Sequence, residues 1–228
     1  MCRRKDCSSL LRFDSQAFHL DSHPKRLNMD YSKRLIGLTG GIATGKTTVS
    51  NYLAQKYHLP ILDADIYAKE AVAPESSILK NIFQRYGDRV KLNNNSLDRT
   101  ALGEIIFNDP HQKQWLENQI HPYVRDRFER ELERICESTI VLSIPLLFEA
   151  ELTDTVTEIW VVSCDRELQI ARLQQRNGLT SNQAIVRIDN QFPLSQKVAS
   201  ADVVINNNSS LENLYTQIDR AIELKPKI

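Results

Sequence analysis

The segment Gly40–Thr47, with the sequence GGIATGKT, is the feature that most constrains the fold of this chain. Its first glycine, four free positions and closing Gly-Lys-Thr match the pattern of a phosphate-binding loop. The apolar run at residues 35–39 predicts a strand before the loop, and residues 47–57 predict a helix after it. In that order the loop directs backbone N–H groups and a helix N-terminus towards phosphate oxygens. We therefore expect a nucleotide-binding site here.

The motif also assigns roles to its side chains. Lys46 is expected to reach the β- and γ-phosphates as a catalytic residue, and the Thr47 hydroxyl is expected to bind Mg²⁺. Nucleotide contacts are expected from Gly41, Ile42, Ala43, Thr44, Gly45, Lys46, Thr47 and Thr48.

Apolar runs alternate with helical patterns along the rest of the chain. The predicted strands lie at residues 35–39, 61–62, 140–143, 159–163 and 203–205, each apolar at successive positions as in a sheet covered on both faces. This order is typical of an α/β fold with a parallel five-stranded sheet. We expect a three-layer P-loop NTPase sandwich with a helical acceptor-binding insertion and a lid.

The expected domain covers residues 34–228, with the nucleotide core formed by residues 34–73 and 138–228. About 75 residues separate the second and third strands, so residues 74–137 are interpreted as a helical insertion. It is a natural place for acceptor contacts, although extra helices also simply cover a sheet. A lid is expected at about residues 177–195. A core stripe at helical spacing runs through Leu116, Ile120, Val124, Phe128, Leu132 and Ile135.

Charged residues near the strand ends are further candidates for the site. Asp63 and Asp65 follow the second strand, where open α/β sheets bind ligands, so one is interpreted as catalytic and the other as a helix cap. Arg172 and Arg176 share a helix face after the fourth strand. They form either a phosphate clamp or a solvated face. His121-Pro122 is interpreted as a helix boundary or kink.

The bulk composition excludes few function classes. Residues 1–33 are polar and aperiodic and are expected to be disordered; the alternatives are a transit peptide or a natural start at Met29. The chain has 29 basic and 29 acidic residues, which gives no overall attraction to nucleic acid or membrane. Its four scattered cysteines do not predict zinc or disulfides. Without a secretory signal or an apolar span, a cytoplasmic protein is expected.

These motifs, in order, resemble the dephospho-CoA kinase family, from about Arg34 to near the C-terminus. The loop alone is shared by many families, whereas the ordered set is far more specific. The resemblance rests on Gly37-Leu38-Thr39-Gly40-Gly41-Ile42, Gly45-Lys46-Thr47, Asp63-Ala64-Asp65, Leu97-Asp98-Arg99, His121-Pro122, Pro145-Leu146-Leu147-Phe148-Glu149, Ala201-Asp202 and Ile205-Asn206.

The resemblance implies ATP-dependent phosphorylation of the ribose 3′-hydroxyl of dephospho-CoA, the last step of coenzyme A synthesis. It implies that Asp65 is the base, that Thr39, Arg99 and His121 bind the CoA moiety, and that Arg172 lies near the nucleotide. A monomer or weak homo-oligomer is expected. The chain departs from the family where Ala43-Thr44 replace the common Gly-Ser, because alanine resists a positive φ angle.

Two other functions compete with this one. Another small-molecule kinase of the same architecture, acting on a nucleoside, a nucleotide or shikimate, would share the loop but not the full motif set. A GTPase-like switch module would need Asn-Lys-x-Asp and Asp-x-x-Gly stretches after the loop, and the sequence contains neither.

Overall fold

The computed structural model describes residues 33–224, so most of the predicted disordered stretch lies outside the described residues. The chain divides into two compact units, which are described separately. One is a helical unit, Ala64–Arg134. The other is a nucleotide core, which within the described range comprises residues 33–63 and 135–224. The sequence placed the start of the insertion at Pro74, whereas α2 (Ala64–Ala71) already belongs to the helical unit.

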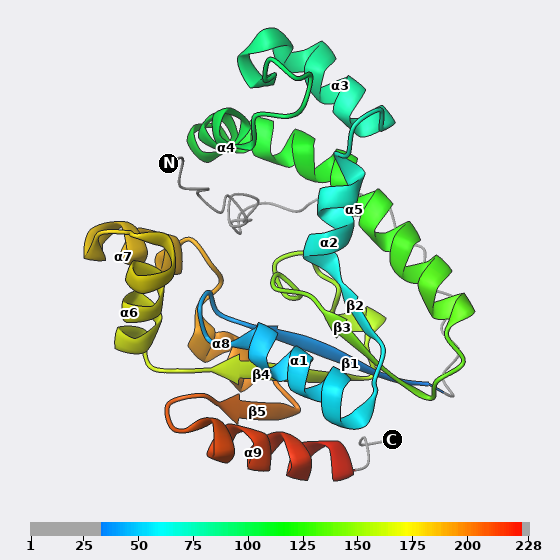
Figure 1. Ribbon diagram of the computed structural model, residues 1–228, viewed down its shortest axis with the longest axis vertical. Helices are drawn as coiled ribbons and strands as arrows, with labels where there is room; N and C mark the ends of the chain where they lie inside the picture. Colours follow the sequence, from blue (N-terminus) through cyan, green and yellow to red (C-terminus); the bar gives the residue numbers. More distant parts are fainter. Residues whose placement is uncertain (1–32, 225–228) are drawn as a thin grey trace. The chain divides into compact units, whose positions relative to one another are not determined.

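The nucleotide core is built on a parallel sheet in the order β2-β3-β1-β4-β5 (Figure 1). Its strands are β1 (Arg34–Gly40), β2 (Ile61–Asp63), β3 (Thr139–Ser143), β4 (Glu158–Ser163) and β5 (Val203–Asn206). All five predicted strands are confirmed, each within a residue at either end. The apolar runs predicted these strands because β1, β3 and β4 are buried along most of their length.

Helices cover both faces of this sheet. On one face Ile36 and Leu38 pack with α1 (Lys46–Tyr57) and α9 (Leu211–Glu223) around the fully buried Trp160. On the other face Gly37 lies against Leu147 and Val156, so alternate residues of β1 point to opposite layers. The remaining helices of the core are α6 (Arg166–Asn177), α7 (Ser181–Asp189), α8 (Leu194–Ala199) and the short η2 (Thr153–Thr155).

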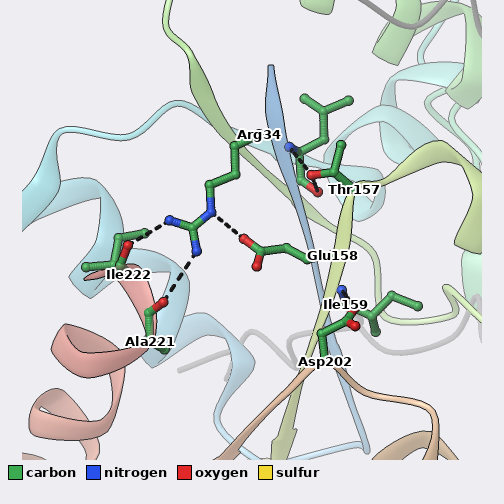
Figure 2. Close-up of polar contacts among 8 residues, drawn as sticks. Arg34, Thr157, Glu158, Ile159, Asp202, Ala221 and Ile222 are labelled. Carbon is green, nitrogen blue, oxygen red and sulfur yellow. Dashed lines mark hydrogen bonds and ion pairs between the residues drawn. The ribbon is translucent and has the colours of Figure 1, made fainter. Parts of the chain in front are cut away.

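Arg34 joins β1, β4 and α9 at the edge of the sheet where the strands begin (Figure 2). Its guanidinium pairs with Glu158 and donates to the backbone carbonyls of Ala221 and Ile222 in the last turn of α9. A cation there satisfies carbonyls that have no partner within the helix. This contact stabilises the edge opposite the phosphate loop.

The helical unit contains α2, α3 (Ser77–Tyr86), η1 (Gly87–Val90), α4 (Arg99–Asn108) and α5 (Pro110–Arg134). Tyr67 of α2 packs edge-to-face on Phe128 of α5, with ring centroids 5.2 Å apart. This packing explains why α2 belongs here. The predicted core stripe of α5 is confirmed for its four buried members, Leu116, Ile120, Val124 and Phe128.

Of the two interpretations of His121-Pro122, the helix boundary is wrong, because α5 runs through Pro122, and the kink stays a prediction. Proline removes one backbone donor, but the 25-residue helix retains its buried apolar stripe on both sides of it. Within residues 33–224, no helix is both long and apolar enough to cross a membrane.

Candidate nucleotide-binding and catalytic site

The phosphate loop connects the central strand β1 to α1, and it folds through three residues with positive φ. Gly40 has φ 158°, Ala43 has φ 60° and Gly45 has φ 103°. Ala43 therefore adopts the left-handed conformation that its side chain was expected to resist. That conformation costs roughly 1 kcal/mol for alanine relative to glycine. The surrounding contacts must hold the loop against this strain.

Side chains from the loop itself and from distant segments of the chain bind the carbonyls of the loop. The Thr44 hydroxyl donates to the Gly41 carbonyl at 2.9 Å, and the Asn207 side-chain amide donates to the Thr44 carbonyl at 2.7 Å. Arg172 donates to the carbonyls of Ala43 and Thr44, each at 3.2 Å, and to the Asn207 carbonyl at 3.0 Å. These bonds fix the loop from its outer side.

The Arg172 guanidinium therefore contacts the phosphate loop through backbone carbonyls, and its implied place near the nucleotide stays a prediction. Arg176, one turn further along α6, is exposed and donates to its neighbour Asn177. The exposure of Arg176 agrees with a solvated face, and the phosphate clamp stays a prediction.

The amides of the loop are largely left for a ligand. Those of Ala43, Gly45 and Thr47 donate to no group within residues 33–224, whereas the Thr48 amide bonds to the Gly45 carbonyl. Unpaired N–H groups at the start of a helix, with the positive end of its dipole, form a site for an anion. This arrangement suits the phosphates of a nucleotide.

Lys46 points to the carboxyl ends of the neighbouring strands. Its ammonium donates to the buried Ser143 hydroxyl at 2.7 Å, and that hydroxyl donates to Asp63 at 3.0 Å. Ser143 ends β3 and is paired in register with Asp63 of β2 and Leu38 of β1. Ser143 was not among the predicted site residues. Its position at a predicted strand end, beside the strand that carries the aspartates, was the available signal.

The other predicted residues of the core differ in exposure. Thr47, the predicted magnesium ligand, is exposed in the first turn of α1. Thr39, predicted to bind substrate, is fully buried, and its hydroxyl donates to the Pro145 carbonyl at 3.1 Å. Its hydroxyl is therefore used inside the core in this structure.

The segment from Pro145 to Glu149 is anchored by a buried ion pair. Lys197 of α8 lies 2.7 Å from Glu149, and both side chains are essentially inaccessible to solvent. Lys197 also donates to the Pro145 carbonyl, and the amide of Phe192 donates to Glu149. Burial lowers the pKa of Lys197, and the adjacent carboxylate opposes that shift. The pair holds the end of the predicted lid against the turn after β3.

Three of the predicted site residues lie in the helical unit. Asp65 is exposed in the first turn of α2, and Arg99 is the half-buried first residue of α4, after its cap Asp98. His121 is half-buried on α5, where burial lowers its pKa to about 4. Its imidazole is therefore neutral at pH 7. The roles of all three residues stay predictions.

The helical unit also contains an open cavity of about 890 Å³. It combines apolar and aromatic walls with two arginines and two acidic residues. It is lined by Arg85, Tyr86, Arg89, Ala101, Glu104, Ile105, Asn108, Asp109 and Gln112.

A parallel sheet whose central strand leads through a phosphate loop into a helix defines an α/β P-loop nucleotide-binding protein. The profile of a kinase family, described as dephospho-CoA kinase, matches residues 34–213. The chain belongs to the dephospho-CoA kinase family, and it is therefore a kinase.

Individual relatives agree with this assignment. The chain is 54% identical over 203 residues to a dephospho-CoA kinase of Synechocystis, which covers 89% of this chain and 98% of the relative. It is 55% identical over 197 residues to that of Trichormus variabilis, covering 85% and 99% of the two chains.

Solved structures are similar as well. A Thermus thermophilus protein, TT1252, superposes with a TM-score of 0.74 at 32% identity, covering 83% of this chain and 96% of that one. The dephospho-CoA kinase of Campylobacter jejuni superposes with a TM-score of 0.61 at 27% identity, covering 84% and 96%.

Proposed function

We propose that this protein transfers the γ-phosphoryl group of ATP to the ribose 3′-hydroxyl of dephospho-CoA. A bond forms between the 3′-oxygen and the γ-phosphorus, the bond from that phosphorus to the β,γ-bridging oxygen breaks, and ADP leaves. The observation that supports this most is the phosphate loop with its amides left for a ligand and Lys46 at the strand ends, in a chain of the dephospho-CoA kinase family.

The loop would bind ATP through its phosphates. The amides of Ala43, Gly45 and Thr47, together with the start of α1, provide donors for phosphate oxygens. The ammonium of Lys46 would move from Ser143 towards the β- and γ-phosphates and offset the charge that develops during transfer. Little covalent chemistry is required of the protein, so positioning and charge supply most of the catalysis.

The residues present also fit a Mg²⁺ ion. In sites of this kind Mg²⁺ usually keeps several waters and is held by one or two protein groups together with substrate phosphates. Two groups would hold Mg²⁺: the exposed Thr47 hydroxyl and the Asp63 carboxylate. Asp63 is linked to Lys46 through the Ser143 hydroxyl. When bound, the ion neutralises phosphate charge.

Asp65 would accept the proton of the attacking 3′-hydroxyl, in line with its exposed position at the start of α2. We assign acceptor binding to the helical unit, through Arg99, His121 and the cavity beside α4. Thr39 would help to position the acceptor. The neutral His121 suits a hydrogen bond to the acceptor better than an ion pair. We further expect a cytoplasmic monomer or weak homo-oligomer that does not bind nucleic acid.

An acceptor panel tests the proposal. Purified protein is incubated with Mg²⁺ and ATP plus dephospho-CoA, AMP, a nucleoside or shikimate, and ADP release is followed with mass spectrometry of each product. We expect phosphorylation of dephospho-CoA in large excess over the others. Tight ATP binding with turnover of a different acceptor would assign the protein another substrate within the same fold.

A further inference from the structure

Two buried glutamines bracket the peptide groups of Ile42 in the phosphate loop. The Gln191 Oε1 atom accepts a hydrogen bond from the Ile42 amide at 2.6 Å. On the other side, the Gln169 Nε2 atom donates to the Ile42 carbonyl at 2.7 Å. Gln169 is 3% exposed and Gln191 is 9% exposed. Because the partners are a backbone donor and a backbone acceptor, the orientation of each side-chain amide is fixed.

The two glutamines come from different parts of the core. Gln169 lies on α6, whereas Gln191 lies in the connection between α7 and α8, within the predicted lid. The side chain of Ile42 is buried with Leu173 of α6 and Ala184 of α7. The predicted lid therefore contacts the phosphate loop twice, through packing of Ala184 in α7 and through the hydrogen bond of Gln191 after α7.

The approach of Gln169 depends on the glycine before Ile42. A β-carbon at Gly41 would lie 2.7 Å from the Gln169 Nε2 atom, which is too close for a real contact. Glycine thus leaves the space that the Gln169 amide needs.

Gln191 is itself held in place from both sides. The backbone amide of Gln191 donates to the Ile188 carbonyl. The backbone amide of the next residue, Phe192, donates to the buried carboxylate of Glu149. The Phe192 ring stacks on Phe148, with centroids 6.1 Å apart. The backbone of Gln191 is therefore fixed before its side chain reaches the loop, which lowers the entropy lost in forming that bond.

We propose that Gln191 is a positioning residue for nucleotide phosphates, coupling the end of the lid to the phosphate loop. Gln191 engages the amide of the Gly41–Ile42 peptide, and Gln169 engages the carbonyl of the next peptide, which enters the strained Ala43; together they set the orientation of the backbone through Ile42. That orientation determines where the following amides, including Ala43 and Gly45, point. The inference rests on the proposed function, which makes ATP the nucleotide that binds the loop. It concerns the binding of ATP and does not depend on which acceptor is phosphorylated.

The test compares Gln191→Leu with Gln196→Leu, the same change at an exposed position of α8. Calorimetry measures the Kd for ATP with Mg²⁺, and steady-state assays measure KM for ATP and for dephospho-CoA. We expect Gln191→Leu to raise both the Kd and the KM for ATP about tenfold, with KM for dephospho-CoA unchanged. Gln196→Leu is expected to match the wild type.

A conservative variant separates positioning from general damage to the fold. Gln191→Glu retains an acceptor oxygen at the same reach, and burial favours its protonated form at pH 6. At that pH it should bind ATP more tightly than Gln191→Leu. If Gln191→Leu does not fold, Gln191→Asn, which is one methylene shorter, replaces it.

The outcomes are separable from the proposed function, because ATP binding is measured without turnover. Weakened ATP binding in Gln191→Leu or Gln191→Asn, restored by Gln191→Glu, supports the inference even if dephospho-CoA is not the acceptor. Wild-type ATP affinity in a folded Gln191→Leu or Gln191→Asn, or an equal loss in Gln196→Leu, would overturn it.

Discussion

The Lys46 ammonium lies 2.7 Å from the Ser143 hydroxyl, which donates in turn to Asp63. A hydrogen bond to a charged group contributes about 1.5–3 kcal/mol, so losing this contact should disturb the position of Lys46. We expect Ser143→Ala to lower kcat/KM about tenfold or more in an ADP-release assay. Ser163→Ala, at the matching end of β4, is the control and should keep nearly full activity. Equal activity of both variants would remove Ser143 from the site.

The positive φ of Ala43 leads to a prediction about stability. Ala43→Gly relieves a backbone strain of roughly 1 kcal/mol in the folded state. It also raises the conformational entropy of the unfolded chain, which lowers the free energy of unfolding by about 0.4–1 kcal/mol. We therefore expect the free energy of unfolding in urea to stay equal or to rise slightly. Gly45→Ala is the opposite case, because a β-carbon there would overlap the Asn207 side-chain amide. It should abolish ATP binding; intact binding would contradict the loop geometry.

The strands and the phosphate loop could be predicted because each depends on a local pattern. Strands such as β3, with four successive buried residues, appear in the sequence as apolar runs, and the loop has a fixed spacing of Gly, Lys and Thr. The apolar stripe predicted helix on both sides of Pro122, whereas the local effect of proline predicted a boundary or a kink. Packing of the stripe carries α5 through Pro122, which local rules alone could not decide.

Three of the residues that hold the loop, Gln169, Gln191 and Asn207, were not predicted, because they lie far from it along the chain. Gln191 and Ile42 are 149 positions apart, and Asn207 and Thr44 are 163 apart. A polar side chain shows no periodic pattern that reveals its partner, so only the folded topology brings such pairs together. The fold thus supplies a role for Gln169, Gln191 and Asn207 that composition and spacing did not indicate.

The buried pair of Lys197 and Glu149 predicts a large effect on stability. Lys197→Met leaves the Glu149 carboxylate buried without its cation, and breaking such a pair costs about 3–5 kcal/mol. Urea denaturation should show this loss. Adding Glu149→Gln removes the unpaired charge, so the double variant should recover part of the stability. A double variant less stable than Lys197→Met would show that the charge of Glu149 is not the cause.

Two groups on α5 predict opposite pH dependences of stability. Burial raises the pKa of Glu117 from 4.5 to about 7, although Lys113 opposes the shift, and burial lowers the pKa of His121 from 6.5 to about 4. The Glu117 contribution is therefore present below pH 4.5 and lost as the pH rises through 7. The His121 contribution is present above pH 6.5 and lost as the pH falls through 4. Between pH 4.5 and 6.5 the two groups therefore change the free energy of unfolding in opposite directions as the pH rises.

Glu117→Gln isolates one of these slopes. Relative to the wild type, its free energy of unfolding in urea should improve as the pH rises from 4.5 to 7, by up to about 1.4 kcal/mol per pH unit. Glu104→Gln, at an exposed glutamate of α4, serves as the control and should track the wild type more closely. A pH-independent difference between Glu117→Gln and the wild type would refute the assignment.

The decisive measurement is the position of the phosphate that the protein adds to dephospho-CoA. Dephospho-CoA is converted with Mg²⁺ and ATP by the wild type, Lys46→Ala and Asp65→Asn, and the product is examined by mass spectrometry and phosphorus NMR. The account predicts a new phosphate on the ribose 3′-oxygen for the wild type, none for Lys46→Ala, and for Asp65→Asn a fall in turnover greater than its loss of dephospho-CoA binding. Absence of that product from a folded, ATP-binding wild type, or wild-type turnover in Lys46→Ala, would contradict it.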